Sequence, residues 1–399
     1  MNIIGIVCEY NPFHKGHAWQ IKESRDALGQ DSAVICVMSG DYVQRGEAAV
    51  FSKFARAEAA CRCGADLVFE LPLPWALSSA EGFARGSVYM LAALGCTHLC
   101  FGSEHGKTDE LELLARCLSE PDIINRIKDR MRKDPRLSFA SARQAVLEEE
   151  IGDTAELLEK PNNILAVEYL KAIVQMKQPL LPHTVERRGS GHDQCGDGEL
   201  RSASELREML RTCGEPGAHI PEAAMEVFHR EIKLGRSVLG GRESELVLLS
   251  RLRMLGESAF TCLPDGGDGA GRRLFKAVRY CGSLDEIYET AVSRRIPQAR
   301  VRRMCLGAAL GLDGSMAAGL PPYARLLAAG QRGRELLRDM EHVATIPVVT
   351  KPASVKHVGA EAEQVFALGA SAHDMYTLLY ASREDRIAGQ DWRTGPKIV

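Results

Sequence analysis

Two histidines near the start of the chain have the spacing of a pair that handles phosphate. His14 and His17 lie in the stretch IIGIVCEYNPFHKGH, directly after a run of apolar and β-branched residues. Residues three apart at a helix start share one face, and Gly16 between them leaves space for an anion to approach the backbone. The helix start adds unpaired N–H groups and the positive end of its dipole. Two imidazoles there can stabilise the α-phosphate of a triphosphate as it becomes five-coordinate.

The same two histidines also fit other roles. An HxxH pair occurs by chance, and both side chains could lie on the surface or bind a metal. Their position favours a nucleotide, because they follow the first strand of an alternating strand–helix pattern. Ligands bind beyond the carboxyl ends of the strands in open parallel sheets. We therefore predict a nucleotide site at this end of the first strand.

The elements that must position these residues are visible as alternating strand and helix signals. Short apolar runs at residues 2–9, 32–40, 66–72 and 97–104 predict strands, and a fifth is expected within 179–189. Near-continuous apolar strands separated by helices indicate a parallel sheet covered on both faces. The expected fold is α/β, with a Rossmann-like parallel sheet.

From near residue 216 the sequence pattern becomes mostly helical. Helical patterns such as ESELVLLSRLRML, GRRLFKAVRYC and LDEIYETAVSRR follow one another there. We expect two domains, residues 1–215 with the parallel sheet and residues 216–399 mostly α-helical.

Composition narrows the class of protein. With 45% hydrophobic residues among 399, a packed core is within reach, and the net charge of −3 gives no bulk sign of a nucleic-acid binder. The 12 cysteines include no CxxC pair, which is typical of reduced thiols, so no dedicated metal site is predicted. No signal peptide or long apolar segment is evident, so we expect a cytoplasmic protein without a membrane span. The oligomeric state is not predicted.

Several stretches resemble one enzyme family. NPFHKGH is similar to the HxGH motif of the nucleotidyltransferase superfamily, whose fold is shared with class I aminoacyl-tRNA synthetases. SGDYVQRGEAAVFSKFARAEAACRCGADLVFELP, FGSE, PNNILAVEYLKA and PYARLLAAGQRGRELL resemble the bacterial tRNA(Met) cytidine acetate ligases. The resemblance runs from residue 3 to about residue 380, and it is looser in the helical half.

The resemblance implies a reaction in two steps. Acetate attacks the α-phosphate of ATP, which gives acetyl-adenylate and pyrophosphate. The exocyclic amine of the wobble cytidine of elongator tRNA(Met) then attacks the acetyl carbonyl and releases AMP. The product is N4-acetylcytidine, and acetyl-CoA takes no part. Mg²⁺ is expected to accompany ATP, because it neutralises phosphate charge.

The resemblance also assigns the loop after the first strand to ATP. His14 and His17 match the motif histidines and take the catalytic role. In this family the loop that carries them lines the nucleotide site. Its other members in this chain are Val7, Cys8, Glu9, Tyr10, Asn11, Pro12, Phe13, Lys15, Gly16, Ala18, Trp19 and Gln20.

Three further residues match ATP contacts of the family. Gly102 in FGSE matches a glycine beside the nucleotide, where the missing side chain allows close approach. Asn162 and Arg187 match polar contacts, and the planar fork of an arginine suits phosphate. The neighbouring Arg188 is the alternative register for that arginine, because the GSGHD after it is one residue shorter than the usual form.

The loop after the second strand has an open assignment. Asp41, Gln44, Arg45, Lys53 and Arg56 are expected at the mouth of the same cleft. They could hold acetate, pyrophosphate or the target cytosine. The alternative is a solvated charged loop that ends in a helix cap.

A second open assignment concerns SASELR, which resembles a phosphate-binding turn of related nucleotidyltransferases. Ser202, Ser204 and Arg207 would then contact phosphate, and a plain N-capped helix is the alternative. His98 and His105 flank the fourth strand and are interpreted as structural.

The densest basic stretch is SRRIPQARVRR, in the helical half. Clustered arginines give affinity for RNA phosphates without sequence readout, although such runs also form solvated helix faces. Together with the resemblance, the stretch predicts a tRNA-binding surface made by Arg294, Arg295, Arg300, Arg302 and Arg303. Further basic residues in this half are Arg272, Arg273, Lys276, Arg279, Lys351 and Lys356.

Two alternative functions use other parts of the pattern. An adenylyltransferase that makes a dinucleotide cofactor fits the fold, but it needs no large helical RNA domain. A non-catalytic ATP- and RNA-binding factor fits the basic stretch, but binding alone does not require the pair of histidines. The residues that hold acetate and those that read the anticodon are not identified by the sequence.

Overall fold

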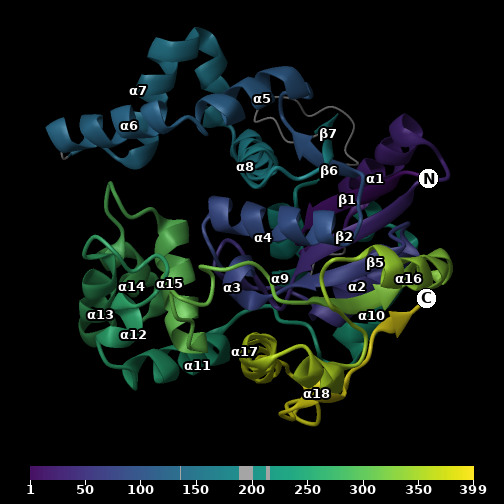
Figure 1. The fold of residues 1–399 in the computed structure, drawn as a ribbon. Helices are drawn as coiled ribbons and strands as arrows, with labels where there is room; N and C mark the ends of the chain where they lie inside the picture. The colour runs from purple at the N-terminus through teal and green to yellow at the C-terminus, as the bar shows by residue number, and fades with distance from the viewer. Residues whose placement is uncertain (135, 188–200, 213–215) are drawn as a thin grey trace.

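A computed structural model describes residues 1–134, 136–187, 201–212 and 216–399. Its centre is a mixed sheet with helices on both faces (Figure 1). The first five long strands are β1 (Ile3–Cys8), β2 (Ala33–Ser39), β5 (Leu67–Leu71), β6 (His98–Ser103) and β7 (Leu181–Glu186). They are parallel and lie in the order β5-β2-β1-β6-β7, so the predicted α/β fold with a Rossmann-like sheet is confirmed.

The sheet continues beyond β5 with strands from the C-terminal part of the chain. β8 (Ala324–Ala329) pairs antiparallel with β5, and β9 (Val348–Val349) and β10 (Lys397–Ile398) pair in parallel with β8. The part after residue 216 is mostly helical, as expected, but these three strands were not predicted. The domain boundary at residue 215 stays a prediction, and the C-terminal segment returns to the N-terminal sheet.

Helices cover both faces of the sheet, which explains why its strands are apolar on both sides. Along β2, Ile35 and Val37 belong to one core, and Val34 and Cys36 belong to the other. The first core is covered by α4 (Ala80–Ala93), α5 (Thr108–Cys117) and α8 (Pro161–Met176). The second is covered by α1 (Lys15–Leu28), α2 (Lys53–Arg62), α9 (Ala203–Arg211) and α10 (Glu222–Lys233).

Two groups of helices lie away from the sheet in Figure 1. The upper group is α6 (Pro121–Lys133) and α7 (Phe139–Ile151). The lower group has its own apolar core and contains α11 (Arg242–Arg253), α12 (Ser258–Thr261), α13 (Ala270–Tyr280), α14 (Leu284–Ala291) and α15 (Gln298–Leu310). The remaining helices are α3 (Leu73–Ala76), α16 (Gln331–Val343), α17 (Ala360–Thr377) and α18 (Gln390–Arg393). Over the described ranges, no helix is both long and apolar enough to cross a bilayer.

Candidate active site

A cleft of about 630 Å³ opens at the carboxyl ends of β1 and β6, which is where the sequence places the nucleotide. It brings together His17, Gly102, Asn162 and Arg187 from four separate segments. The other predicted residues that line it are Val7, Cys8, Glu9, Tyr10, Asn11 and Gln20. The rest of the predicted loop lies outside the lining, namely Pro12, Phe13, His14, Lys15, Gly16, Ala18 and Trp19.

The two histidines are locked together by the start of α1. His14 is the N-cap residue, and its Nδ1 accepts a hydrogen bond from the N–H of Gly16 at 3.0 Å. The N–H of His14 in turn donates to Nδ1 of His17 at 3.2 Å. The two rings are stacked with their centroids 3.7 Å apart. Because each Nδ1 accepts from the backbone, the proton of each neutral ring sits on Nε2.

Both imidazoles are neutral at physiological pH. Burial, with a smaller contribution from the charge of Arg187, lowers the pKa of His14 to about 4. Burial also lowers the pKa of His17 well below its ordinary value, and His14 and Arg187 add to that effect. A neutral ring whose Nδ1 is occupied can donate from Nε2–H, but it has no free nitrogen to take up a proton. The pair is therefore suited to hydrogen-bond donation and not to base catalysis.

Gly16 has a packing role that the sequence did not predict, and its predicted role in admitting an anion stays a prediction. A Cβ at this position would lie 2.9 Å from Cε1 of His14, closer than side chains tolerate. The glycine therefore makes room for the His14 ring, and His14 lies behind His17 instead of lining the cleft. The His17 ring is supported from below by Tyr10 and Phe13, at centroid distances of 4.8 Å and 5.6 Å.

The far side of the cleft carries a chain of polar contacts that ends in Arg187. Nη1 of Arg187 donates to Oδ1 of Asn162 at 3.3 Å, and Nδ2 of Asn162 donates to Oε1 of Glu104 at 2.6 Å. A Cβ on Gly102 would lie 3.1 Å from Cγ of Arg187, so the glycine allows that side chain to pass over β6. Glu104 was not predicted, although it belongs to the FGSE motif. The alternative residue Arg188 lies outside the described residues.

The five residues after β2 whose functional assignment was left open divide into two groups. Gln44 and Arg45 lie at the tip of the hairpin formed by β3 (Tyr42–Val43) and β4 (Glu47–Ala48), and both line the cleft. Asp41, Lys53 and Arg56 do not line it. They are buried beneath the hairpin, so the expectation of a solvated loop is wrong for these three.

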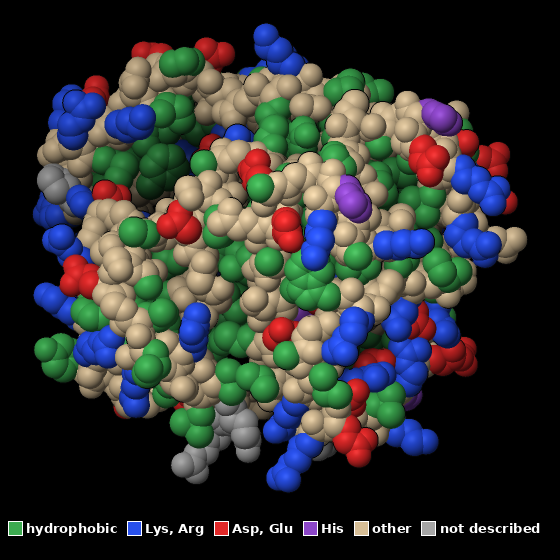
Figure 2. Space-filling view, turned by 60° about the horizontal axis from the view of Figure 1, so that its bottom comes forward, with side chains coloured by type: hydrophobic (Ala, Val, Ile, Leu, Met, Phe, Trp, Pro, Cys, Tyr) green, Lys and Arg blue, Asp and Glu red, His purple; other side chains and the backbone are tan. Residues whose placement is uncertain are grey.

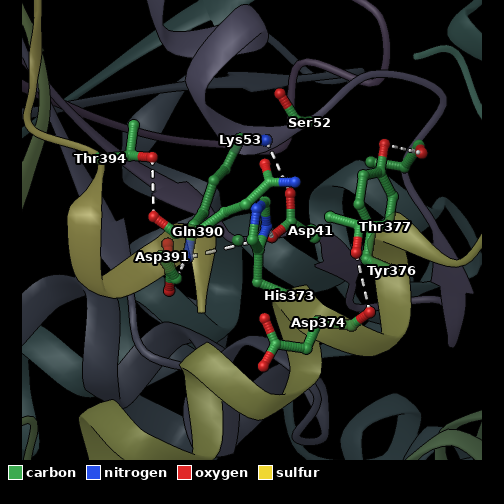
Figure 3. Close-up of polar contacts among 12 residues, drawn as sticks. Asp41, Ser52, Lys53, His373, Asp374, Tyr376, Thr377, Gln390, Asp391 and Thr394 are labelled. Carbon is green, nitrogen blue, oxygen red and sulfur yellow. Dashed lines mark hydrogen bonds and ion pairs between the residues drawn. The ribbon is translucent and has the colours of Figure 1, made fainter. Parts of the chain in front are cut away.

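The buried group ties the hairpin to the C-terminal segment (Figure 3). Asp41 forms an ion pair with Nδ1 of His373 on α17 at 2.7 Å, and it accepts the N–H of Lys53 at 2.8 Å. Nζ of Lys53 pairs with Glu70 and with Asp391 of α18, each at 2.8 Å. The buried ion pairs of Asp41 and Lys53 thus stabilise the base of the hairpin that supplies Gln44 and Arg45 to the cleft.

Helix α9 contributes Arg207 to the cleft, and its two serines form hydrogen bonds within the helix. Ser202 is the N-cap and forms a capping box with Glu205, as in the plain-helix alternative. Nη1 of Arg207 donates to the carbonyl of Asn11 at 2.9 Å, and Nη2 donates to Oγ of Ser204 at 3.1 Å. Among these predicted phosphate contacts, Arg207 lines the cleft, and Ser202 and Ser204 do not.

The basic stretch reaches the same cleft through the start of α15. Arg302 and Arg303 line the cleft together with Gln298 and Ala299. A Cβ on Gly46 of the hairpin would lie 2.5 Å from the backbone nitrogen of Arg303, so a glycine is needed where the two segments meet. The part of the chain predicted to bind tRNA therefore borders the part predicted to bind ATP.

The predicted RNA-binding arginines differ in their surroundings. Nε of Arg303 pairs with Asp265 at 2.8 Å, and the guanidinium of Arg300 donates to the Asp265 carbonyl at 2.7 Å. Arg294 and Arg295 are exposed in the turn before α15. Figure 2 displays one face of the molecule, on which basic side chains are spread among acidic and hydrophobic ones instead of forming one patch.

Other basic residues of the helical half have local partners or lie on the surface. Arg272 pairs with Glu257 at 3.1 Å, and the guanidinium of Arg273 donates to the carbonyl of Ala291 at 2.9 Å. Nη1 of Arg279 donates to the carbonyl of Arg253 at 2.8 Å. The exposed lysines of this half include Lys276, Lys351 and Lys356.

Three further observations concern the apolar lining of the cleft, the remaining histidines and metal binding. An apolar wall that the sequence did not identify is formed by Phe83, Phe101, Ile164, Leu165 and Tyr169, and it suits a flat base or a methyl group. His98 and His105 do not line the cleft. They contact Thr97 and Glu110 instead, which agrees with a structural role. In the part of the chain that the structure describes, no three His, Cys, Asp or Glu side chains are grouped as a metal site.

The comparisons with known proteins agree with this geometry. The family model described as HIGH nucleotidyl transferase matches residues 1–391, which defines the class of the fold and its cleft. The tRNA(Met) cytidine acetate ligase of Acetivibrio thermocellus is 32% identical over 411 residues and covers 98% of both chains. The one of Syntrophomonas wolfei is 33% identical over 413 residues and covers 99% of both. The chain belongs to the tRNA(Met) cytidine acetate ligase family.

Solved structures give the same result. The crystal structure of Thermotoga maritima TmcAL bound with alpha-thio ATP is 31% identical, has a TM-score of 0.92 and covers 100% of both chains. The apo form of the same protein gives a TM-score of 0.93. The family resemblance noted in the sequence is thereby confirmed.

Proposed function

We propose that this ligase activates acetate with ATP and transfers the acetyl group to the wobble cytidine of elongator tRNA(Met), giving N4-acetylcytidine. The observation that carries the proposal is the stacked pair of neutral histidines, whose Nδ1 atoms both accept backbone N–H groups. Nε2–H of His17 is thereby left to donate at the carboxyl end of β1.

In the first step, acetate attacks the α-phosphate and pyrophosphate leaves. Negative charge builds on the α-phosphate oxygens, and Nε2–H of His17 donates to them there. His14 holds the His17 ring in place and sets its tautomer. Arg45, Arg187 and Arg207 line the same cleft and supply positive charge for the phosphates. Mg²⁺ would arrive bound to the triphosphate and neutralise its charge, and no step is assigned to it.

In the second step, the amine of the wobble cytidine attacks the acetyl carbonyl and AMP leaves. Arg302 and Arg303 of α15 line the cleft, and the exposed Arg294 and Arg295 lie in the turn just before this helix, so tRNA bound there would place its anticodon loop near the adenylate. We place this reaction in the cytoplasm, because its substrate is a tRNA.

The test is an acetylation assay with purified protein, ATP, acetate and elongator tRNA(Met). Mass spectrometry of the digested tRNA should detect N4-acetylcytidine only when all of these are present. Acetylation with acetyl-CoA in place of acetate and ATP would overturn the ligase chemistry. Transfer of AMP to a mononucleotide, with no modified tRNA, would instead support the adenylyltransferase alternative.

A further inference from the structure

The acetyl-transfer step needs a proton acceptor that the histidine pair does not provide. When the N4 amine of cytidine attacks a carbonyl, its nitrogen becomes positively charged and must lose a proton. The Nδ1 atoms of His14 and His17 are occupied by backbone N–H groups, and their Nε2 atoms carry protons. A protein base for this step would have to be another residue of the cleft.

Glu9 is the only carboxylate among the described residues that line the cleft. The residue follows β1 directly, in the loop that leads to α1, and His17 lies in the first turn of that helix. The tyrosines of the cleft are poor bases, because burial raises the pKa of Tyr10 and Tyr169 well above the ordinary value and keeps them protonated. Burial also raises the pKa of the Cys8 thiol.

The Glu9 side chain is oriented by one hydrogen bond from the hairpin, and its backbone is fixed by a second contact. Its Oε1 accepts the backbone N–H of Gln44 at 2.8 Å, and its backbone carbonyl accepts a hydrogen bond from the buried guanidinium of Arg56. No described residue forms a hydrogen bond with the second carboxylate oxygen, Oε2, so this oxygen can accept one from a ligand. The carboxylate is half-buried at the cleft wall, so it is ordered and reachable at the same time.

A carboxylate is also the group that recognises cytosine. Glu and Asp side chains accept a hydrogen bond from the N4 amine of this base, and enzymes that act on a base read its Watson–Crick edge after taking it out of the stack. The same contact that selects the amine can remove its proton.

We propose that Glu9 binds the N4 amine of the target cytidine through Oε2 and takes its proton during acetyl transfer. The N4–C bond forms, the bond between the acetyl carbon and the phosphate oxygen breaks, and its electron pair leaves with AMP. The amine proton moves to Glu9. This inference rests on the proposed function and names the residue that acts in its second step.

The protonation behaviour of Glu9 agrees with this role. Burial raises the pKa of Glu9 above its ordinary value and the charge of Glu47 adds to the shift, although the Gln44 N–H and the charges of Arg45 and Arg56 oppose it. A carboxylate with a raised pKa is a stronger base than an exposed one. Because the base must be ionised, the transfer rate should rise with pH through the pKa of Glu9 and then level off.

The test compares Glu9→Gln with Glu9→Ala in the full-length protein. Glutamine keeps an oxygen for the Gln44 N–H but cannot take a proton. Acetate-dependent exchange of pyrophosphate into ATP measures the first step, and single-turnover transfer from enzyme-bound acetyl-adenylate to tRNA measures the second. For Glu9→Gln we expect transfer slowed about 10²–10⁴-fold with loss of the rise with pH, and a much smaller change in exchange. For Glu9→Ala both steps should weaken, because the hairpin loses its anchor.

A matched control is Glu58→Gln, which changes a buried carboxylate of α2 that pairs with Arg230 outside the cleft. Its two half-reactions should fall together or not at all. Equal loss of both steps in Glu9→Gln, or normal transfer, would overturn the role of Glu9. Failure of the proposed function is distinguishable, because wild-type protein would then give no acetate-dependent exchange.

Discussion

His14 and His17 receive their hydrogen-bonding direction from the helix that they begin. An N-cap histidine whose Nδ1 accepts a backbone N–H has its proton on Nε2, and the reciprocal bond imposes the same tautomer on its neighbour. Burial keeps both rings uncharged. The backbone and the burial of two side chains thus convert general acid–base groups into fixed donors.

Replacement of His17 by alanine tests that conversion. We expect His17→Ala to slow acetate-dependent pyrophosphate exchange about 10²–10³-fold, the usual cost of one lost donor to a developing oxyanion. Binding of tRNA, measured by filter retention, should not change, because the proposed partner of the cleft residue His17 is the α-phosphate of ATP. Parallel loss of tRNA binding would mean that the histidine pair is structural.

The His14 ring also makes folding depend on pH. The pKa of His14 is about 4 in the folded protein against an ordinary value of 6.5, so the unfolded chain binds more protons between these values. Stability should therefore fall as pH decreases through this window, by about 3 kcal/mol over its full range. Urea unfolding of wild type and His14→Gln at pH 7.5 and 5.5 should give a smaller drop for the variant. An equal drop would assign the dependence to other groups.

At the scale of elements, α15 is where the two expected activities meet. Its first turn borders the cleft, and the turn before it exposes Arg294 and Arg295. Arg303, in contrast, is buried and paired with Asp265. Of the five arginines that the sequence groups by proximity, Arg294 and Arg295 are therefore surface charges, Arg303 belongs to an internal ion pair, Arg300 bonds the backbone of Asp265 and Arg302 lines the cleft.

The double substitution Arg294→Gln and Arg295→Gln should weaken tRNA binding and flatten its salt dependence. Removal of two phosphate contacts should reduce the slope of log K against log salt by about 1.4–1.8. Pyrophosphate exchange should stay normal. Arg303→Gln is the contrasting variant, because it leaves Asp265 unpaired and should lower the melting temperature. An unchanged slope in the double variant would place the RNA surface elsewhere.

The sequence predicts those helices and strands whose pattern is contained within the element itself. Four of the five parallel strands are short apolar runs punctuated by helices, which is the pattern that predicts them, and β7, with the sequence LPHTVE, follows the same alternation with helices. Strand β8 has the sequence ARLLAA, which contains helix-favouring residues and no alternation, and a short apolar run does not distinguish helix from strand. The meeting of Gly46 with Arg303 could not be predicted, because it depends on packing between segments far apart in the chain.

At the scale of the whole molecule, the C-terminal segment completes the sheet and the buried charge network that the N-terminal part of the chain begins. β8 adds to the sheet edge at β5, and α17 and α18 bring His373 and Asp391 beneath the hairpin of the active site. Arg325 of β8 shares Asp391 with Lys53, at 2.8 Å from each. The charges that support Gln44 and Arg45 thus come from both ends of the chain.

Asp391→Ala tests whether this buried network supports the fold and the cleft together. The variant leaves the buried side chains of Lys53 and Arg325 with Glu70 as their shared close partner, and the loss of one member of a buried ion pair costs about 3–5 kcal/mol. Urea unfolding should detect that loss. Glu149→Ala is the control, because its ion pairs with Arg126 and Arg130 are exposed, and its stability should stay near that of wild type.

The same variant should also affect the reaction in a particular way. The backbone N–H of Lys53 donates to Asp41 at the base of the hairpin, so a displaced Lys53 would loosen the loop that carries Gln44 and Arg45. We expect Asp391→Ala to raise the KM for ATP more than it lowers kcat in pyrophosphate exchange, measured at a temperature where the variant is fully folded. Unchanged kinetics in a destabilised variant would mean that the network supports the fold and leaves the cleft unaffected.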